Sequence, residues 1–278
     1  MNNDKDFSLD LLGIKPIGES VKTVTDGTVQ GVAAFLSRIC LPAAEEFGLL
    51  LRDRVRNWRT ANVVAVGAEA ERIHERMEIP TGYLAHPKLV SGILEHSSWE
   101  DGEQLRKMWA GLLASSCSED GKDDSNLPFM NIVSSLTALQ ASVLNYACEN
   151  TTVRKNRVGL LWGTKVVADE KTLYGICGMD DLERIDRELD GLRQMEMISR
   201  GFSVDMKTVQ ADITPTALAL HLYVRTQGWL FSALDFYQLA ESVPYNPITG
   251  KPYPESEKAG KEQAAALGPG TASAEPGQ

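Results

Sequence analysis

Apolar positions at helical spacing dominate the first 127 residues. One apolar face over residues 17–40 predicts an amphipathic helix, weakened by Gly27 and Gly31 because an interior glycine costs about 1 kcal/mol relative to alanine. Pro42 suits the first turn of a helix, and the next proline comes only after Met77. The pattern therefore predicts one long helix over 42–77, of about 35 residues and ~50 Å, with a bend near Gly67.

Two further helices are predicted before residue 118. His86 and Pro87 open a short helix with an apolar face. The segment 95–115 predicts an amphipathic helix, in which the spacing of Ser97 to Glu100 and of Ser98 to Asp101 is typical of a capping box. Glu103 adds a third acid, which the positive end of the helix dipole would stabilise. The apolar stripe of this helix consists of Leu105, Met108, Trp109 and Leu112.

The second half alternates helices with short strands. Residues 118–127 form a charged loop, and Thr137 with Gln140 predicts a capped helix. Residues 158–168 fit either a strand or a loop, and Gly175 and Gly178 indicate a turn before a long apolar stripe over 182–195. Alternating residues then predict two strands around 205–207, and Thr214-Pro215 predicts the start of another helix.

This order predicts a mainly α fold with two parts. A helical region over 15–127 contains the long helix, and a winged-helix-like α+β domain over 128–242 ends in an aromatic helix that begins near Trp229. Residues 1–14 are expected to be a flexible N-terminus. Residues 243–278 are rich in proline, glycine, alanine and serine, which predicts a disordered tail.

In a winged-helix domain, the helix predicted over 182–195 would be the one that reads DNA. Its charge argues against DNA binding. Between Asp180 and Met195 there are six acids and three arginines, and the whole chain has a formal net charge of -10. A helix with this balance would repel phosphates, whereas known DNA readers gain affinity by releasing counterions. The winged-helix-like domain is therefore expected to contact protein and not duplex DNA.

One arginine run provides a candidate interaction surface. Arg52, Arg56 and Arg59 share a helix face, with Trp58 beside them and Asn62 three residues further on. Their guanidinium groups could bind phosphates or carboxylates through paired hydrogen bonds. The alternative is a solvated face whose arginines pair with Asp53, Glu71, Glu75 or the acids at 100–103.

Neither a catalytic site nor a cofactor or metal site is predicted. His74, His86, His96 and His221 lack metal-ligand spacing, and no phosphate-binding or dinucleotide motif occurs. The cysteines at 40, 117, 148 and 177 never form a Cys-x-x-Cys pair, so we interpret them as buried thiols in a reducing cytoplasm. The acidic N-terminus does not have the form of a secretory signal, and residues 32–51 are interrupted by charges, so any membrane contact is expected to be peripheral.

Four groups of residues between 42 and 141 form one wider pattern. They are Pro42, Ala43, Glu46 and Gly48; Trp58, Arg59 and Asn62; Glu100, Asp101, Glu103, Trp109, Ala110, Leu112 and Leu113; and Leu136, Thr137 and Ala141. This pattern resembles that of the Abi-alpha family, bacterial proteins linked to abortive phage infection. The resemblance covers residues 15–227, and it departs from the family pattern at Ser142, where an acidic or small residue is usual.

The resemblance implies a role in phage defence by abortive infection, in which the chain acts as a sensor or effector through macromolecular contacts. A protein partner or a second copy of the chain is expected. Two alternatives remain at this point. The helix over 17–40 could act on a membrane as a toxin, or the chain could regulate through nucleic acid. The sequence does not identify a small-molecule substrate.

Overall fold

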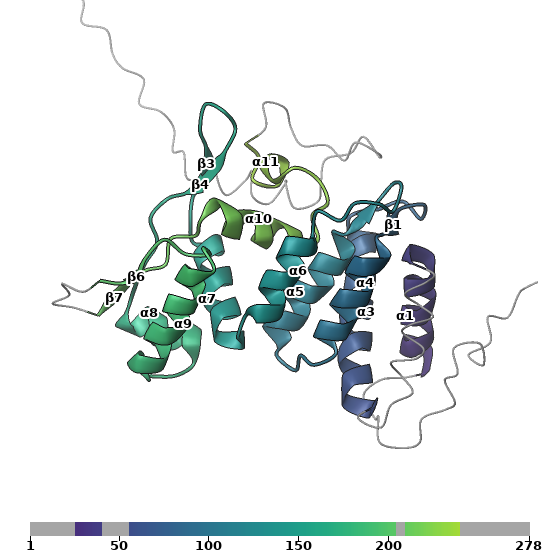
Figure 1. The fold of residues 1–278 in the computed structure, drawn as a ribbon, viewed down its shortest axis with the longest axis horizontal. Coiled ribbons are helices and arrows are strands. Elements are labelled where there is room, and N and C mark those ends of the chain that lie inside the picture. The colour runs from purple at the N-terminus through teal and green to yellow at the C-terminus, as the bar shows by residue number, and fades with distance from the viewer. Residues whose placement is uncertain (1–25, 41–55, 204–208, 240–278) are drawn as a thin grey trace, which may run out of the picture. The chain divides into compact units, whose positions relative to one another are not determined.

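The computed structural model describes residues 26–40, 56–203 and 209–239, which are mostly helical with small antiparallel sheets (Figure 1). The chain divides into a compact unit, Met1–Leu230, and a second unit, Phe231–Gln278. A mainly α fold with some strand is thus confirmed. The predicted segments 1–14 and 243–278 lie outside the described residues, and a boundary near residue 127 stays a prediction.

Helices α1 (Asp26–Ile39) and α3 (Arg56–Arg76) pack against each other at one side of the first unit (Figure 1). The apolar face of α1, including Phe35 and Leu36, is buried. A Cβ atom on Gly67 would lie 2.5 Å from Val32 Cγ1, so this glycine lets α1 approach α3 closely. The predicted residues 17–25 and 42–55 of these two helices lie outside the described residues.

The segment predicted as one capped helix over 95–115 is divided between two helices. Helix α4 (Pro87–Ser97) begins after His86, whose Nδ1 atom accepts a hydrogen bond from the Lys88 amide, and it ends at the C-cap Ser98. Helix α5 (Glu103–Ala114) begins after Gly102, which provides no side-chain cap. The predicted capping boxes at Ser97 and Ser98 are therefore wrong.

The two serine hydroxyls explain this difference. Ser97 and Ser98 donate hydrogen bonds back to the carbonyl oxygens of Leu94 and Glu95, at 3.4 and 2.6 Å. These bonds satisfy carbonyl groups in the last turn of α4. A serine hydroxyl can bond to the backbone at the end of a helix as well as at its start. The acids Glu100 and Asp101 lie in the turn between the helices, and only Glu103 is in the first turn of α5.

Two short strands and one short helix lie between α3 and α7 in addition to α4 and α5. Strands β1 (Leu84–Ala85) and β2 (Cys117–Ser118) pair in antiparallel fashion, and helix α6 (Leu127–Ser135) follows the charged loop. The sequence pattern missed all three. Helix α7 (Ala138–Glu149) begins with the predicted capping box, in which Thr137 and Gln140 exchange hydrogen bonds of 3.2 and 3.0 Å.

The later strands of the described part form two further sheets, separate from the β1–β2 pair. Strands β3 (Val153–Lys155) and β4 (Leu161–Gly163) make a hairpin, so part of the ambiguous stretch 158–168 is extended. Strands β5 (Val167–Asp169), β6 (Gly201–Phe202) and β7 (Gln210–Asp212) make an antiparallel sheet with β7 in the middle. The tip between β6 and β7 lies in residues 204–208, outside the described part.

Helices α8 (Glu170–Cys177) and α9 (Leu182–Gln194) lie between β5 and β6 along the chain. Gly175 is inside α8, so the turn predicted there is wrong, whereas Gly178 ends the helix in a left-handed conformation with φ of 64°. The stripe of α9 is buried at Ile185, Leu189 and Leu192, as predicted.

Helix α10 (Ala217–Thr226) closes the first unit. Its N-cap is Thr216, whose hydroxyl oxygen accepts a hydrogen bond from the Ala219 amide, so the predicted start at Thr214-Pro215 is two residues too early. In the second unit, α11 (Ala233–Phe236) is a single turn. The predicted aromatic helix is thus shorter than expected, and Trp229, which is buried in the first unit, precedes it.

Helix α5 lies at the centre of the first unit. It contacts α3, α4, α6, α7 and α10. Trp109 is fully buried on this helix, and its ring stacks on that of His96 with centroids 5.9 Å apart. Among the described helices, none is both long enough and apolar enough to span a bilayer.

Candidate functional site

Arg59 of the predicted arginine surface is bound within the molecule. Its Nε atom donates to Ser98 Oγ at 2.9 Å, and its Nη2 atom donates to both carboxylate oxygens of Glu95 at 3.0 and 2.9 Å. The guanidinium carbon lies 4.1 Å from the centre of the Trp99 ring. Arg59 therefore holds the turn between α4 and α5 against α3, and its carboxylate partner is Glu95, not an acid suggested by the sequence.

Asn62 reinforces the same turn. It is 3% exposed, its Nδ2 atom donates to the carbonyl oxygen of Ser98 at 3.1 Å, and its Oδ1 atom accepts from Arg106 Nη1 at 3.4 Å. A buried amide that bonds to two other segments has a structural role. We call Arg59, Asn62, Glu95, Ser98 and Trp99 the turn clamp.

Two other residues of the predicted surface lie at the start of α3. Arg56 and Trp58 are in the first turn of α3, and Arg52 lies outside the described residues. The sequence allowed either a binding surface or an intramolecularly paired face for these arginines, and Arg59 is paired within the molecule. Trp99 is 51% exposed, so one side of the clamp is open to solvent.

The acids of the predicted family helix have different surroundings. Burial, followed by the nearby negative charge of Asp101, raises the pKa of Glu100. A hydrogen bond and the positive charge of Lys107 lower the pKa of Glu103, whose carboxylate lies 2.7 Å from Lys107 Nζ on the surface of α5. Glu103 and Asp101 are exposed and Trp109 is in the core, so these residues do not form one site.

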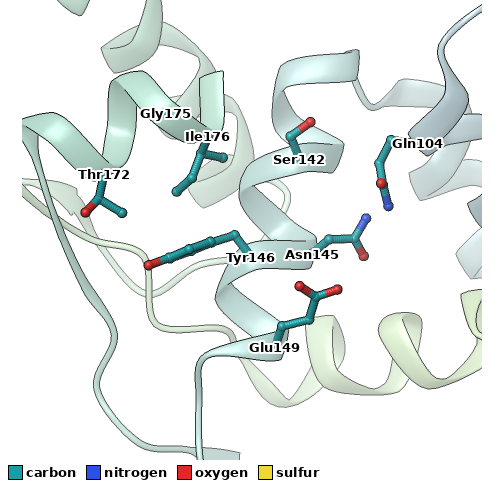
Figure 2. A pocket seen from close by; sticks show the side chains of 8 residues that line it. All are labelled: Gln104, Ser142, Asn145, Tyr146, Glu149, Thr172, Gly175 and Ile176. Carbon is teal, nitrogen blue, oxygen red and sulfur yellow. The ribbon is translucent and has the colours of Figure 1, made fainter. Parts of the chain in front are cut away.

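A groove of about 460 Å³ lies between α5, α7 and α8 (Figure 2). Helix α7 provides half of the lining residues, which share one helix face because they lie three or four positions apart. Gln104 comes from α5, and α8 contributes the other side, including Gly175, where an added Cβ atom would meet nothing within 4 Å. The lining residues are Gln104, Ser142, Asn145, Tyr146, Glu149, Thr172, Gly175 and Ile176.

Asn145 is the most informative residue of this groove. Only 6% of it is exposed, and its buried Nδ2 atom has no hydrogen-bond partner in the described part of the chain. Figure 2 shows its amide directed toward Gln104, with the Glu149 carboxylate on the same side of α7. An unpaired buried donor costs about 1–3 kcal/mol, so a ligand that brought an acceptor to this atom would recover that energy.

The groove offers recognition chemistry. Ser142 Oγ donates to the Ala138 carbonyl oxygen at 3.0 Å, which leaves its oxygen able to accept a hydrogen bond. Glu149 is exposed and supplies one negative charge, and Tyr146 supplies an aromatic ring. The lining residues include neither histidine nor cysteine. Such a set can bind a group that combines a hydrogen-bond acceptor with a positive charge.

The cysteines and histidines lie elsewhere. Cys40, Cys117 and Cys148 are buried as predicted, whereas Cys177, at the end of α8, is only half-buried, so the prediction is wrong for this cysteine. Burial raises the pKa of Cys117 to about 12 and that of Cys177 to about 11, so both thiols are protonated at neutral pH and poorly nucleophilic. Among the described residues, no group of three His, Cys, Asp or Glu side chains could hold a metal ion.

Sequence reasoning missed the groove, although one signal was present. Asn145 occupies the buried side of α7 between Ala141 and Cys148, where the other residues are apolar. A polar residue on an apolar stripe indicates either an internal hydrogen bond or a binding site. The contributions of α5 and α8, however, come from segments about 30 to 40 residues away and leave no local pattern.

The described part of the chain is thus a mainly helical protein with a polar groove beside its central helix. The family model described as "Abortive infection alpha" matches residues 62–216, and the chain belongs to this family. The match is shorter than the resemblance over 15–227, and the motifs from Pro42 to Arg59 lie before it. No curated protein and no solved structure matches the chain.

Proposed function

We propose that the protein acts in phage defence by abortive infection, and that it acts by binding a protein partner in the groove between α5, α7 and α8. The family supports the biological role. The observation that carries the binding role is the unpaired, buried Nδ2 atom of Asn145 beside an exposed carboxylate.

The groove favours a protein segment as its occupant. A backbone carbonyl oxygen is an acceptor that fits the Asn145 amide, and a lysine or arginine side chain fits the charge of Glu149. The groove is open at the surface, whereas small-molecule sites usually enclose most of their ligand. We therefore expect a partner that presents a basic side chain next to exposed backbone.

The order of elements supports a winged-helix-like domain for this region. Helix α7 is followed by the β3–β4 hairpin, strand β5, helices α8 and α9, and strands β6 and β7, and the sheet order is β5-β7-β6. Apart from the hairpin inserted after α7, this is the order of a three-helix domain with a wing. Two of the three helices, α7 and α8, line the groove, which favours protein contact over DNA contact for this domain.

Filling the groove without disturbing the fold tests the proposal. In Gly175→Leu the new side chain starts in open space and would occupy the groove, and leucine favours a helix by about 1 kcal/mol over glycine. Gly31→Leu is a matched control, because Gly31 of α1 also has nothing near a Cβ atom. The measurement is the efficiency of phage plating on cells that produce each variant, with thermal melts of the purified proteins.

We expect Gly175→Leu to lose protection at an unchanged or higher melting temperature, and Gly31→Leu to protect like the parent. Asn145→Leu, which removes the unpaired donor, should also lose protection. Full protection by a folded Gly175→Leu protein would refute the groove as the binding site.

A further inference from the structure

The β3–β4 hairpin, residues 151–165, is a second surface with unusual chemistry. It contains four cations, Arg154, Lys155, Arg157 and Lys165, and no acid, in a chain whose net charge is -10. Three large apolar residues on it are exposed: Val158 by 79%, Leu160 by 64% and Trp162 by 47%. These are among the most exposed large apolar side chains in the described part of the protein.

The hairpin is well anchored at its base. Leu161 is buried, β4 packs against α10, and Thr151 Oγ1 donates to the Thr164 carbonyl oxygen at 2.8 Å. The Thr152 amide in turn donates to Thr164 Oγ1 at 3.0 Å. Figure 1 shows the loop between β3 and β4 extending away from α7 and α10.

The tip of the hairpin is also ordered. Asn156 Oδ1 accepts hydrogen bonds from the amides of Val158 and Leu160, at 3.0 and 2.9 Å. Gly159 has φ of 86°, a conformation that glycine adopts without strain. The exposed apolar side chains are thus presented on a defined turn, and their exposure is not the result of an irregular loop.

Two of the cations, Arg154 and Lys155, lie in strand β3 directly behind this apolar tip. Arg154 is opposite Trp162 across the hairpin, so the two side chains are on the same face. Arg157 is within the tip itself, next to Val158. Arg154, Lys155 and Arg157 are exposed, and none of the three forms an ion pair with another described residue.

We propose that the β3–β4 hairpin docks on an anionic lipid bilayer, with Val158, Leu160 and Trp162 entering the interface and the three cations binding lipid headgroups. Apolar side chains gain free energy on leaving water, and tryptophan prefers the interfacial zone. Basic residues beside them are attracted to anionic headgroups. This surface is distinct from the groove, so the two proposals can fail independently.

A nucleic acid is the less favoured partner for the hairpin. Phosphates would attract the cations, but the aliphatic side chains of Val158 and Leu160 gain nothing from contact with a phosphate backbone. Because these side chains are at the tip, they would meet the partner first. A lipid bilayer fits this arrangement better, because it offers an apolar interior to the tip and anionic headgroups to the cations.

The test is co-sedimentation of the full chain with vesicles. One set contains phosphatidylglycerol and phosphatidylethanolamine, and the other contains phosphatidylcholine alone. The apolar variant is Val158→Ser with Leu160→Ser and Trp162→Ser, and the charge variant is Arg154→Gln with Lys155→Gln and Arg157→Gln. A matched control, Lys88→Gln with Lys107→Gln and Lys122→Gln, removes three exposed cations elsewhere.

We expect the parent and the control to bind the anionic vesicles, and both hairpin variants to bind at least about tenfold more weakly, since each cation near such a surface contributes severalfold to affinity. Binding should decrease as salt is added. The tryptophan emission of the parent should shift to the blue on binding, and Trp162→Phe should reduce that shift.

Three results would overturn the proposal. The parent could fail to bind anionic vesicles, or both hairpin variants, shown by melts to be folded, could bind them like the parent. Tighter binding of the parent to a mixed-sequence duplex than to the vesicles, lost in the charge variant, would assign the hairpin to nucleic acid instead.

Discussion

At the scale of single residues, His74 shows how burial sets protonation. It lies on α3, it is 3% exposed, and its ring meets Phe35 edge-on with centroids 5.7 Å apart. Its Nε2 atom has no hydrogen-bond partner within the described residues. Burial, followed by the positive charge of Arg38, lowers the pKa of His74 from 6.5 to about 4. The neutral ring is therefore the form that the fold accepts.

This shift predicts a loss of stability in mild acid. Below pH 6.5 His74 is protonated in the unfolded chain, but in the folded chain it becomes protonated only near pH 4. Between these values the unfolded state binds more protons than the folded state, so the free energy of unfolding falls as the pH decreases. The loss attributable to His74 is about 3 kcal/mol. Denaturant titrations across this range should show a shallower pH dependence for His74→Leu than for the parent.

At the scale of elements, glycines set how closely helices approach. A Cβ atom on Gly111 of α5 would collide with the backbone carbonyl group of Thr226, at the end of α10. A backbone group cannot move aside as a flexible side chain can. Gly67 has the corresponding role between α3 and α1, although there the neighbour is the side chain of Val32.

The Gly111 contact gives a prediction with a matched control. Gly111→Ala should destabilise the protein by about 1–3 kcal/mol, as expected for overpacking. Gly31→Ala, where a Cβ atom meets nothing, should be neutral or stabilising by up to about 1 kcal/mol, through helix propensity. Thermal melts of the two variants measure the difference. Equal melting temperatures would show that α5 and α10 can separate without cost.

At the scale of the whole molecule, charge is distributed unevenly along the chain. Residues 180–195 contain six acids and three bases, whereas the hairpin over 151–165 contains four cations and no acid. On α9, Arg187 and Arg193 are paired with Glu183 and Asp190 at 3.8 and 2.8 Å. These arginines thus compensate acids on the same helix, and little positive potential remains on α9 for a phosphate backbone.

The full chain is accordingly predicted not to bind duplex DNA through α9. Fluorescence anisotropy with a labelled mixed-sequence duplex at low salt should give no submicromolar affinity, because a helix of net charge -3 repels phosphates. The pair Arg184→Ala and Arg193→Ala should make no difference. If submicromolar binding did occur and this pair abolished it, α9 would be a DNA-reading helix after all.

Local patterns in the sequence determined most of the helices. The capping box of Thr137 and Gln140, the start at His86-Pro87 and the stripe of α9 each depend on residues within about four positions of one another, which is the range of helical hydrogen bonds. The mainly α class, the family and the buried Trp109 followed from such patterns.

Tertiary structure alone decided which helix Ser97 and Ser98 belong to, and where a groove would form. A serine can bond to the end of one helix or the start of the next. Here both serines bond to the end of α4, and Ser98 also contacts Arg59 and Asn62, which lie 39 and 36 residues away in the sequence. Asn145 becomes part of a groove only because α5 and α8 pack on either side of α7. Contacts between distant segments depend on how whole helices pack, and the spacing of residues within one helix carries no record of its neighbours.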